Sequence, residues 1–174
     1  MARLLILSFL LFTSSVFSFD LPDGWRLPTK KELSDDYRKH FNVELVKATG
    51  DYNGDSNVDT ALILVSTKFQ GDGLFVYLSN PSGYTWMKLD SDNWDKSYPD
   101  KNYIYSGPNM GIGTLTIEDT KKYIARSIER YGSEEPKDKE ILTPSLDYFR
   151  LESAGSLFYW SKVEGKFIRY WYSD

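Results

Sequence analysis

The sequence predicts an α+β fold, a mainly antiparallel β meander with two short helices in a single domain. Aromatic residues make up 16% of the chain, and most of them lie in short alternating runs that are typical of strands. Two other segments carry apolar residues at helical spacing. No internal repeat and no long linker divides the chain, so we expect one domain.

The first expected helix begins after Thr29. Thr29 and Glu32 have the spacing of a capping box, in which each side chain satisfies a backbone amide of the other residue. Leu33, Tyr37 and Phe41 then recur every four residues and would place one apolar stripe against the core. This pattern predicts a helix at the start of the domain.

The meander follows this helix. Ile63 and Val65 alternate with Leu62 and Leu64, so this strand is apolar on both faces and should be central and covered on both sides. Glycine-containing turns separate it from the next two strands. The strands predicted in this half of the chain comprise residues 43–48, 59–67, 74–79 and 84–89.

The second half begins with a polar, turn-rich segment, residues 90–108. Ile117, Ile124 and Ile128 then mark a second helix, which Gly132 should end in the left-handed conformation. A charged loop follows the helix. Three further strands joined by connections of hairpin length are expected at residues 146–152, 157–161 and 167–172.

The N-terminus predicts export from a bacterial cell. Arg3 precedes an apolar stretch too short to span a membrane, and Val16 and Ser18 suit a signal peptidase, so residues 1–18 are expected to be cleaved before Phe19. The remaining 19–174 domain then has 20 basic and 25 acidic residues, a net charge of −5. This charge disfavours nucleic acid and anionic membranes as partners. The chain has no cysteine, which favours a periplasmic or secreted bacterial protein held together without disulfides.

One segment, residues 51–59, has metal-site spacing. Its oxygen-bearing side chains stand at positions 1, 3, 5 and 9, position 7 can offer a carbonyl, and calcium takes six to eight oxygen ligands. Carboxylates this close repel one another unless a cation lies between them. A solvated turn without metal is the alternative. The expected ligands are Asp51, Asn53, Asp55, the carbonyl of Asn57, and Asp59.

This segment resembles the calcium loops of FG-GAP and VCBS repeats, whose D-x-N-G-D-G-x-x-D pattern leads into an apolar strand. The resemblance implies the same five calcium ligands. Ser56 stands where the family has its second glycine, and serine adopts the left-handed conformation at some cost. The segment differs from an EF-hand loop, because Leu62 replaces the closing acid and a strand is expected where a helix should follow.

The whole chain is also similar to a group of small exported bacterial proteins that carry a single VCBS-like motif and have no known activity. The similarity rests on residues 21–26, the 51–59 loop, residues 73–76, and the aromatic ending at 159–160 and 171–174. It supports export and a single domain, and it implies no activity.

Little in the sequence points to catalysis. His40 is the only histidine, and at the end of the first expected helix it is explained as a cap. With no cysteine and no G-x-S-x-G motif, nucleophilic catalysis has no recognisable residues. A glycoside hydrolase that uses two carboxylates stays open as the less favoured alternative, since acids are abundant. We therefore expect a protein that is not an enzyme.

Two regions are candidate partner-binding surfaces. The closing strands should place Tyr159, Arg169 and Trp171 in one register and Phe158, Trp160 and Tyr170 in the other, more aromatics than one buried face uses. A second buried layer is the alternative. The other region is an acidic run with the candidate contacts Asp92, Trp94 and Asp95, which can contact a basic partner or simply be a solvated loop.

These observations predict an exported, non-catalytic binding protein with a structural calcium site. An immunity or inhibitor protein acting on a periplasmic toxin or cell-wall hydrolase suits a small acidic domain without catalytic residues. A glycan-binding module, in which the aromatic side chains stack on sugar rings, is the alternative.

Overall fold

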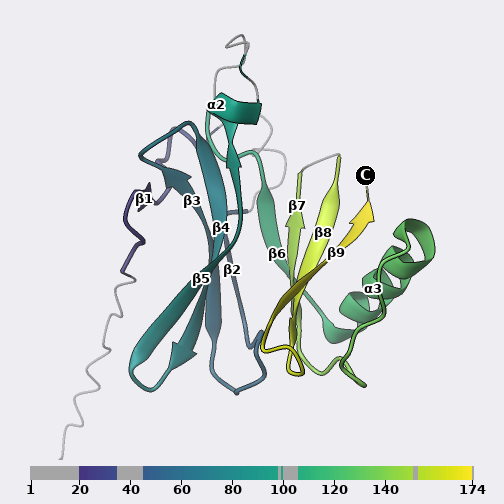
Figure 1. The fold of residues 1–174 in the computed structure, drawn as a ribbon. Coiled ribbons are helices and arrows are strands. Elements are labelled where there is room, and N and C mark those ends of the chain that lie inside the picture. Colours follow the sequence, from purple (N-terminus) through teal and green to yellow (C-terminus); the bar gives the residue numbers. More distant parts are fainter. Residues whose placement is uncertain (1–19, 35–44, 98, 100–105, 151–152, 174) are drawn as a thin grey trace, which may run out of the picture.

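A computed structural model describes residues 20–34, 45–97, 99, 106–150 and 153–173 of the chain (Figure 1). It confirms the predicted class, since antiparallel strands predominate in these residues and two helices, one of them short, accompany them in one compact unit. The strands form two sheets (Figure 1). The expected signal peptide, His40, and Tyr37 and Phe41 of the first expected helix lie outside the described residues.

The first sheet has the strand order β1-β3-β4-β5, and β2 pairs with β3 beside β1. The long hairpin of β4 and β5 is paired along its whole length, with a bulge between Leu74 and Phe75. The strands are β1 (Trp25–Arg26), β2 (Lys47–Gly50), β3 (Asp59–Ser66), β4 (Gly71–Asn80) and β5 (Gly83–Asn93).

β3 is buried along its whole length, as its two-sided apolar pattern predicts. Ala61 and Ile63 belong to the core between the two sheets, while Leu62 and Leu64 pack with Phe75 on the opposite face. A strand buried on both faces has a nearly continuous apolar sequence. The prediction that this strand is central and covered on both sides is therefore confirmed.

The second sheet has the order β6-β7-β8-β9. Its first strand was not predicted, because Gly111 and Gly113 interrupt the alternation that indicates a strand. The amide of Ile112 donates to the carbonyl of Leu45 at 2.9 Å and so links this sheet to the segment before β2. The strands are β6 (Gly111–Leu115), β7 (Ser145–Phe149), β8 (Gly155–Ser161) and β9 (Lys166–Ser173).

The long helix α3 (Ile117–Tyr131) lies where the isoleucine spacing predicts it. Thr116 caps its N-terminus by accepting the Asp119 amide at 3.1 Å. Gly132 ends it with φ +64°, which places its amide 3.1 Å from the Ile128 carbonyl. A second, one-turn helix, α2 (Trp94–Ser97), lies in the segment that was expected to be polar and turn-rich, and it was not predicted.

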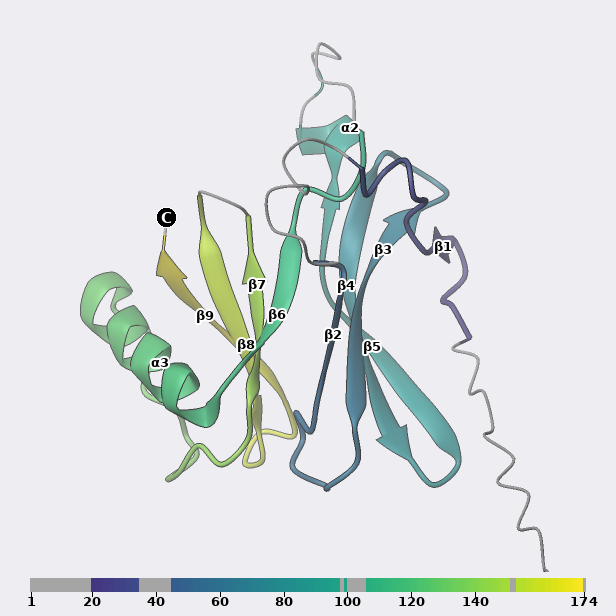
Figure 2. The same ribbon diagram turned by 180° about the vertical axis from the view of Figure 1, so that it is seen from behind.

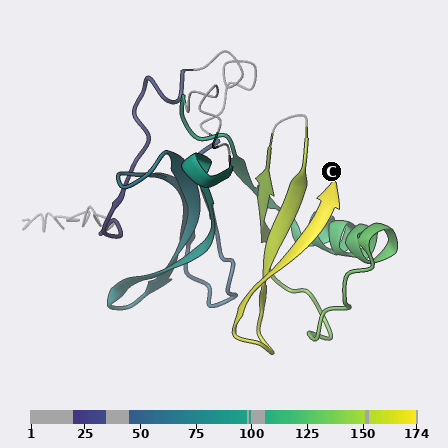
Figure 3. The ribbon, with the colours of Figure 1, turned by 45° about the horizontal axis from the view of Figure 1, so that its top comes forward.

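The elements stack in layers. The two sheets lie side by side, and α3 covers the face of the second sheet that points away from the first (Figures 2 and 3). Both sheets contribute to the largest core cluster, with Ile63 and Val76 from the first and Leu146 and Phe158 from the second. A separate cluster around Ile124 lies between the second sheet and α3.

The predicted capping box of Thr29 and Glu32 is present, but the described residues that it caps, 30–33, form a turn where the start of a helix was expected. The Thr29 amide donates to the Glu32 carboxylate at 2.7 Å, and the Glu32 amide donates to the Thr29 hydroxyl at 3.3 Å. The Arg26 guanidinium, 2.7 Å from the same carboxylate, lowers the pKa of Glu32 to about 2. The turn at residues 30–33 is therefore tied to β1.

Candidate functional site

The 51–59 loop is organised by the first of its expected calcium ligands. One Asp51 carboxylate oxygen accepts the amides of Gly54 at 2.7 Å and Asp55 at 3.0 Å, and the other accepts the Ser56 amide at 2.9 Å. An aspartate that accepts amides a few residues ahead is a common way to close a turn. Asp51 therefore shapes the loop from within.

Two residues of the loop have positive φ. Gly54 has φ +73°, and a Cβ there would lie 2.8 Å from both the Lys162 ammonium and the Thr143 methyl group. Glycine is therefore required by conformation and by space. Ser56 has φ +69°, so the serine in place of the family's glycine is indeed held in the left-handed region.

The last expected ligand, Asp59, is fully buried at the start of β3. Its carboxylate accepts the Tyr52 amide at 3.0 Å and the Ser79 amide at 2.9 Å, and so joins the loop to β4. Burial raises the pKa of Asp59, and the hydrogen bonds from the backbone oppose that shift. A buried carboxylate with two amide donors stabilises the loop whether or not a metal is bound.

The three middle ligands lie at the exposed tip of the loop. The Asn53 side-chain amide donates to Asp55 at 3.0 Å, and the Asn57 backbone amide donates to the other Asp55 oxygen at 2.8 Å. The hydrogen bond from the Asn57 amide, and then that from Asn53, lowers the pKa of Asp55. Asp55 is therefore ionised near neutral pH.

The chemistry of this donor set fits calcium, because every expected ligand atom is an oxygen. Each carboxylate offers about four lone-pair sites, so the amides leave acceptor capacity on Asp51, Asp55 and Asp59. The three carboxylates do not converge, since no group of three acidic, histidine or cysteine side chains in the described part of the chain could hold a metal. Calcium binding by this loop stays a prediction.

The register of the hairpin formed by β8 and β9 differs from the sequence expectation. Phe158 lies opposite Arg169, and Ser156 lies opposite Trp171. The expected grouping of Tyr159 with Arg169 and Trp171 is therefore wrong. Turn length sets which residues share a face, and sequence alternation within each strand leaves that choice open. Tyr159 is only 2% exposed and packs beneath α3, so it is not part of a contact surface.

Arg169 connects the two sheets. Its guanidinium forms an ion pair with Asp90 of β5 at 2.8 Å, and its Nε donates to the Ser156 hydroxyl at 3.0 Å. The guanidinium carbon lies 3.9 Å from the centre of the Trp171 ring and 5.2 Å from that of Phe158. Arg169 is therefore held by charge, by a hydrogen bond and by aromatic contact at once.

Of the two tryptophans that were candidate contacts in this hairpin, Trp171 is exposed and Trp160 is half-buried. Trp171 is 43% exposed, with Arg169 against its ring. Trp160 is half-buried and packs edge-on against Phe167 at 5.2 Å. The structure therefore leaves Arg169 and Trp171, with Trp160 at their margin, as the candidate contact surface of β9.

The acidic candidates lie at and beside α2, where they stabilise local structure. Asp95 accepts the Gln70 amide at 3.1 Å, and the Trp94 amide donates to the Gln70 carbonyl at 2.8 Å. Asp92 accepts the Ser97 hydroxyl at 2.7 Å. These bonds fix the end of β5, next to the ion pair of Arg169.

Sequence reasoning missed an aromatic surface on the outer face of the first sheet. Trp86 of β5 is 45% exposed and packs against Phe75 with ring centres 5.8 Å apart. Trp25 packs on the same phenylalanine at 4.9 Å, and the Lys88 ammonium lies 5.8 Å from the Trp25 ring. The alternation of Tyr84, Trp86 and Lys88 is a sequence signal that could have found this surface.

Comparison of the chain with protein-family models, curated proteins and solved structures gives no match. The similarity of the 51–59 loop to FG-GAP and VCBS repeats therefore stands on the loop residues alone. Within the described residues, no helix is long and apolar enough to cross a membrane.

Proposed function

We propose that this protein is an exported, non-catalytic binding protein of the immunity or inhibitor type, and that Trp171 is central to its contact surface. The observation that carries the proposal is an exposed tryptophan whose ring is held in place by Arg169 at 3.9 Å. Tryptophan and arginine are enriched among the residues that contribute most to protein–protein binding.

The surface is preorganised. Arg169 already forms its ion pair with Asp90 and its hydrogen bond with Ser156, so a partner does not have to order this side chain. Binding to a fixed side chain avoids the entropy loss of about 0.5–1.5 kcal/mol that immobilising a mobile one costs. This supports a contact surface rather than a tryptophan exposed by chance.

The charges near Trp171 favour a basic partner. Burial raises the pKa of Tyr148 in the adjoining core, and three nearby carboxylates raise it further. Arg169 opposes them. The carboxylates belong to Asp72, Asp90 and Asp92. Three carboxylates against the one guanidinium of Arg169 give this region an excess of negative charge, which would steer a positively charged protein toward it.

A glycan-binding module is the second candidate, and the outer face of the first sheet supplies a specific reason for it. Trp86 and Trp25 lie along one face, both against Phe75, and the Lys88 ammonium lies over the Trp25 ring. The exposed ring of Trp86, with the partly buried Trp25 beside it, can stack on sugar rings, and Lys88 would suit a carboxylated sugar. This surface and the Trp171 surface lie on different sheets, so they can be tested separately.

Trp171→Ala and Trp86→Ala form a matched pair for this test, since both remove an exposed tryptophan from an edge strand. Each variant, with the wild type, is used as bait in a periplasmic extract and in a peptidoglycan pull-down. We expect one stoichiometric protein partner that Trp86→Ala retains and Trp171→Ala loses by about 2 kcal/mol. Thermal melting must show that both variants are folded.

Retention on glycan that only Trp86→Ala removes would instead support the second candidate. Hydrolysis of peptidoglycan, lost on changing one carboxylate, would contradict the non-catalytic proposal. Export is tested by the intact mass of protein recovered from outside the cytoplasm, which should correspond to a chain beginning at Phe19. A mass that retains residues 1–18 would contradict it.

A further inference from the structure

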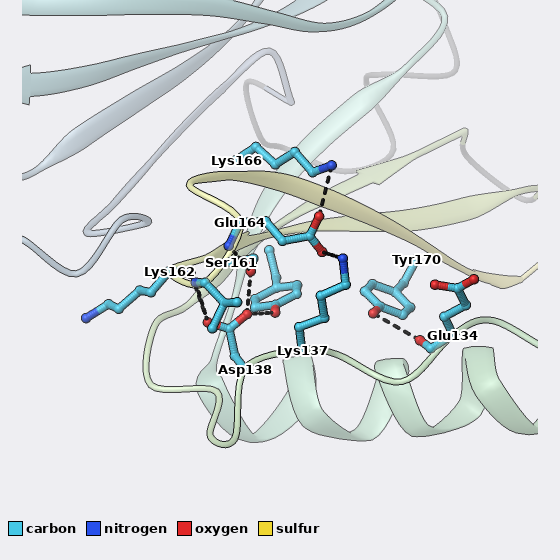
Figure 4. A network of polar contacts seen from close by, with 10 residues as sticks. Glu134, Lys137, Asp138, Ser161, Lys162, Glu164, Lys166 and Tyr170 are labelled. Carbon is cyan, nitrogen blue, oxygen red and sulfur yellow. Dashed lines mark hydrogen bonds and ion pairs between the residues drawn. The ribbon is translucent and has the colours of Figure 1, made fainter.

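The segment between α3 and β7 is fixed to the β8–β9 hairpin through one aspartate. The Asp138 carboxylate accepts the hydroxyls of Tyr159 and Ser161 (Figure 4). It also accepts the backbone amides of Lys162 at 2.9 Å and Val163 at 3.2 Å. Partial burial alone would raise the pKa of Asp138, but these four hydrogen bonds outweigh it and lower the pKa. The charged carboxylate is therefore the form that holds the segment.

Further contacts fix the rest of the segment. Glu164 of the hairpin turn forms ion pairs with Lys137 at 3.4 Å and Lys166 at 3.0 Å (Figure 4). The Tyr170 hydroxyl donates to the Glu134 carbonyl at 3.1 Å. Residues 134–138 are therefore attached at several points, although they form neither helix nor strand.

A groove of about 870 Å³ lies between this segment and α3, and we call it the α3 groove. Its lining includes the side chains of Ile124, Ile128 and Ile141, and Ala125 is exposed on the helix beside them. Ile124 and Ile141 are buried and belong to the cluster beneath α3, so the groove has an apolar floor continuous with the core. Residues of the attached segment form one wall of the groove.

The rim of the α3 groove is charged and net negative. It carries four acidic and two basic side chains, which leaves two negative charges. None of the six forms an ion pair with another described residue. The acidic residues are Glu129, Glu135, Asp138 and Glu140, and the basic residues are Lys121 and Lys139. The rim therefore carries a net negative charge that no ion pair among the described residues neutralises.

We propose that the α3 groove binds a cationic polypeptide segment that inserts an aliphatic side chain against Ile128. The apolar floor gives such a segment area to bury, and the rim carboxylates of Glu129, Glu135 and Glu140 complement its charge. The fixed segment at residues 134–138 makes the groove available without rearrangement. The α3 groove and Trp171 lie on opposite faces of the second sheet, so this inference does not depend on the Trp171 surface.

The test uses charge reversal in the full mature chain. Glu129→Lys with Glu135→Lys changes one groove residue on α3 and one on the loop. Glu118→Lys with Glu134→Lys is the matched control, because these two exposed acids lie on the same helix and the same loop but do not line the groove. Both double variants change the net charge equally, so they separate a local site from general attraction.

The probe is a short amphipathic peptide of lysine and leucine, and calorimetry measures its binding. We expect the groove variant to bind about tenfold more weakly, about 1.4 kcal/mol, with the control close to wild type. Ala125→Trp, which fills the groove from an exposed helix position, should also abolish binding while the melting temperature is kept. The amide NMR signals of residues 124–129 should shift on titration with the peptide.

The proposal is overturned if both double variants weaken binding equally, because the attraction is then general. It is also overturned if the wild type does not bind the peptide, or if the shifted amides lie on β9 around Trp171. A peptide with glutamate in place of lysine should not bind, and tight binding of that peptide would contradict the charge argument.

Discussion

Two irregular segments of this protein are each organised by one aspartate, and they differ in how far that aspartate reaches. Asp51 accepts amides three to five residues ahead, all within its own loop. Asp138 accepts groups 21 to 25 residues ahead, on the hairpin of β8 and β9. The first aspartate closes a turn, whereas the second joins two parts of the fold.

This difference predicts different consequences of losing each carboxylate. Without Asp51, the loop amides can turn to water, because the loop tip is exposed. Without Asp138, the buried hydroxyls of Tyr159 and Ser161 lose the acceptor of their hydrogen bonds, and the segment over them loses its attachment through this side chain. We therefore expect the long-range contacts of Asp138 to contribute more to the free energy of unfolding than the local contacts of Asp51.

The largest expected effect is that of Asp138→Ala. It removes four hydrogen bonds to a charged acceptor, two of them from buried hydroxyls, so the free energy of unfolding should fall by about 3 kcal/mol. Chemical denaturation measures it. A loss below about 1 kcal/mol would show that water replaces the carboxylate and would remove the contrast between the two segments.

The pH dependence of stability sharpens this prediction. The folded-state pKa of Asp138 is lowered, so its ionised form stabilises the fold above the unfolded-state value of 3.8. That contribution is lost as pH falls through the lower, folded-state pKa. Asp138→Asn should therefore destabilise the protein at neutral pH and show a weaker acid dependence below 3.8 than wild type. Equal slopes for the two proteins would contradict the assignment.

Calcium should give the next largest effect, if the 51–59 loop binds it. Ligand linkage predicts a stabilisation of about 2.7 kcal/mol at a hundredfold excess over the dissociation constant. Melting curves with EDTA and with millimolar calcium measure the shift, and Asp55→Ala should abolish it. Glu118→Ala, an exposed acid far from the loop in sequence, is the control. Identical melting curves under both conditions would exclude the site.

Asp51→Ala should cost less than Asp138→Ala in the absence of calcium. Three amides lose their acceptor, but they lie near the surface, so we expect a loss of about 1–1.5 kcal/mol. The change should be local. Hydrogen exchange would then rise at residues 54–56 and stay unchanged in β3, and faster exchange throughout β3 would show that this aspartate also supports the sheet.

The smallest effect should be that of Ser56→Gly, and its sign is opposite. Glycine removes the strain of holding a side chain in the left-handed conformation at φ +69°, but it also raises the entropy of the unfolded chain. The first effect should be the larger, so we expect a net stabilisation of about 0.5 kcal/mol. Denaturation of the two proteins side by side measures this. Destabilisation would mean that the serine side chain contributes more than its conformation costs.

The difference between local and long-range contacts also explains how much of the fold could be predicted from the sequence. The two-sided burial of β3, the helix α3 and the cap at Gly132 all follow from spacing within a few residues. The turn at residues 51–59 follows for the same reason. The strand β6 was not predicted because its two glycines interrupt the alternation of apolar and polar residues. Its position is set by pairing with β7 and by the hydrogen bond to residue 45, which are both contacts with distant parts of the sequence.

The binding surfaces were harder to predict than the fold. Which side chains of β8 and β9 share a face depends on the register of the hairpin, so Tyr159 was placed on the wrong side. The outer surface around Trp86 depends on which face of β5 meets the core. One wall of the α3 groove is the segment that Asp138 attaches to the hairpin, and no local pattern encodes that contact.

The ion pair between Arg169 and Asp90 has a consequence for the order of folding. Its partners are 79 residues apart, so closing this contact costs more chain entropy than forming the hairpin of β8 and β9 around a short turn. We therefore expect each sheet to be largely formed before the pair closes. A contact made after the rate-limiting step leaves the refolding rate unchanged and slows unfolding. Arg169 would then lengthen the time for which the two sheets stay together once the protein has folded.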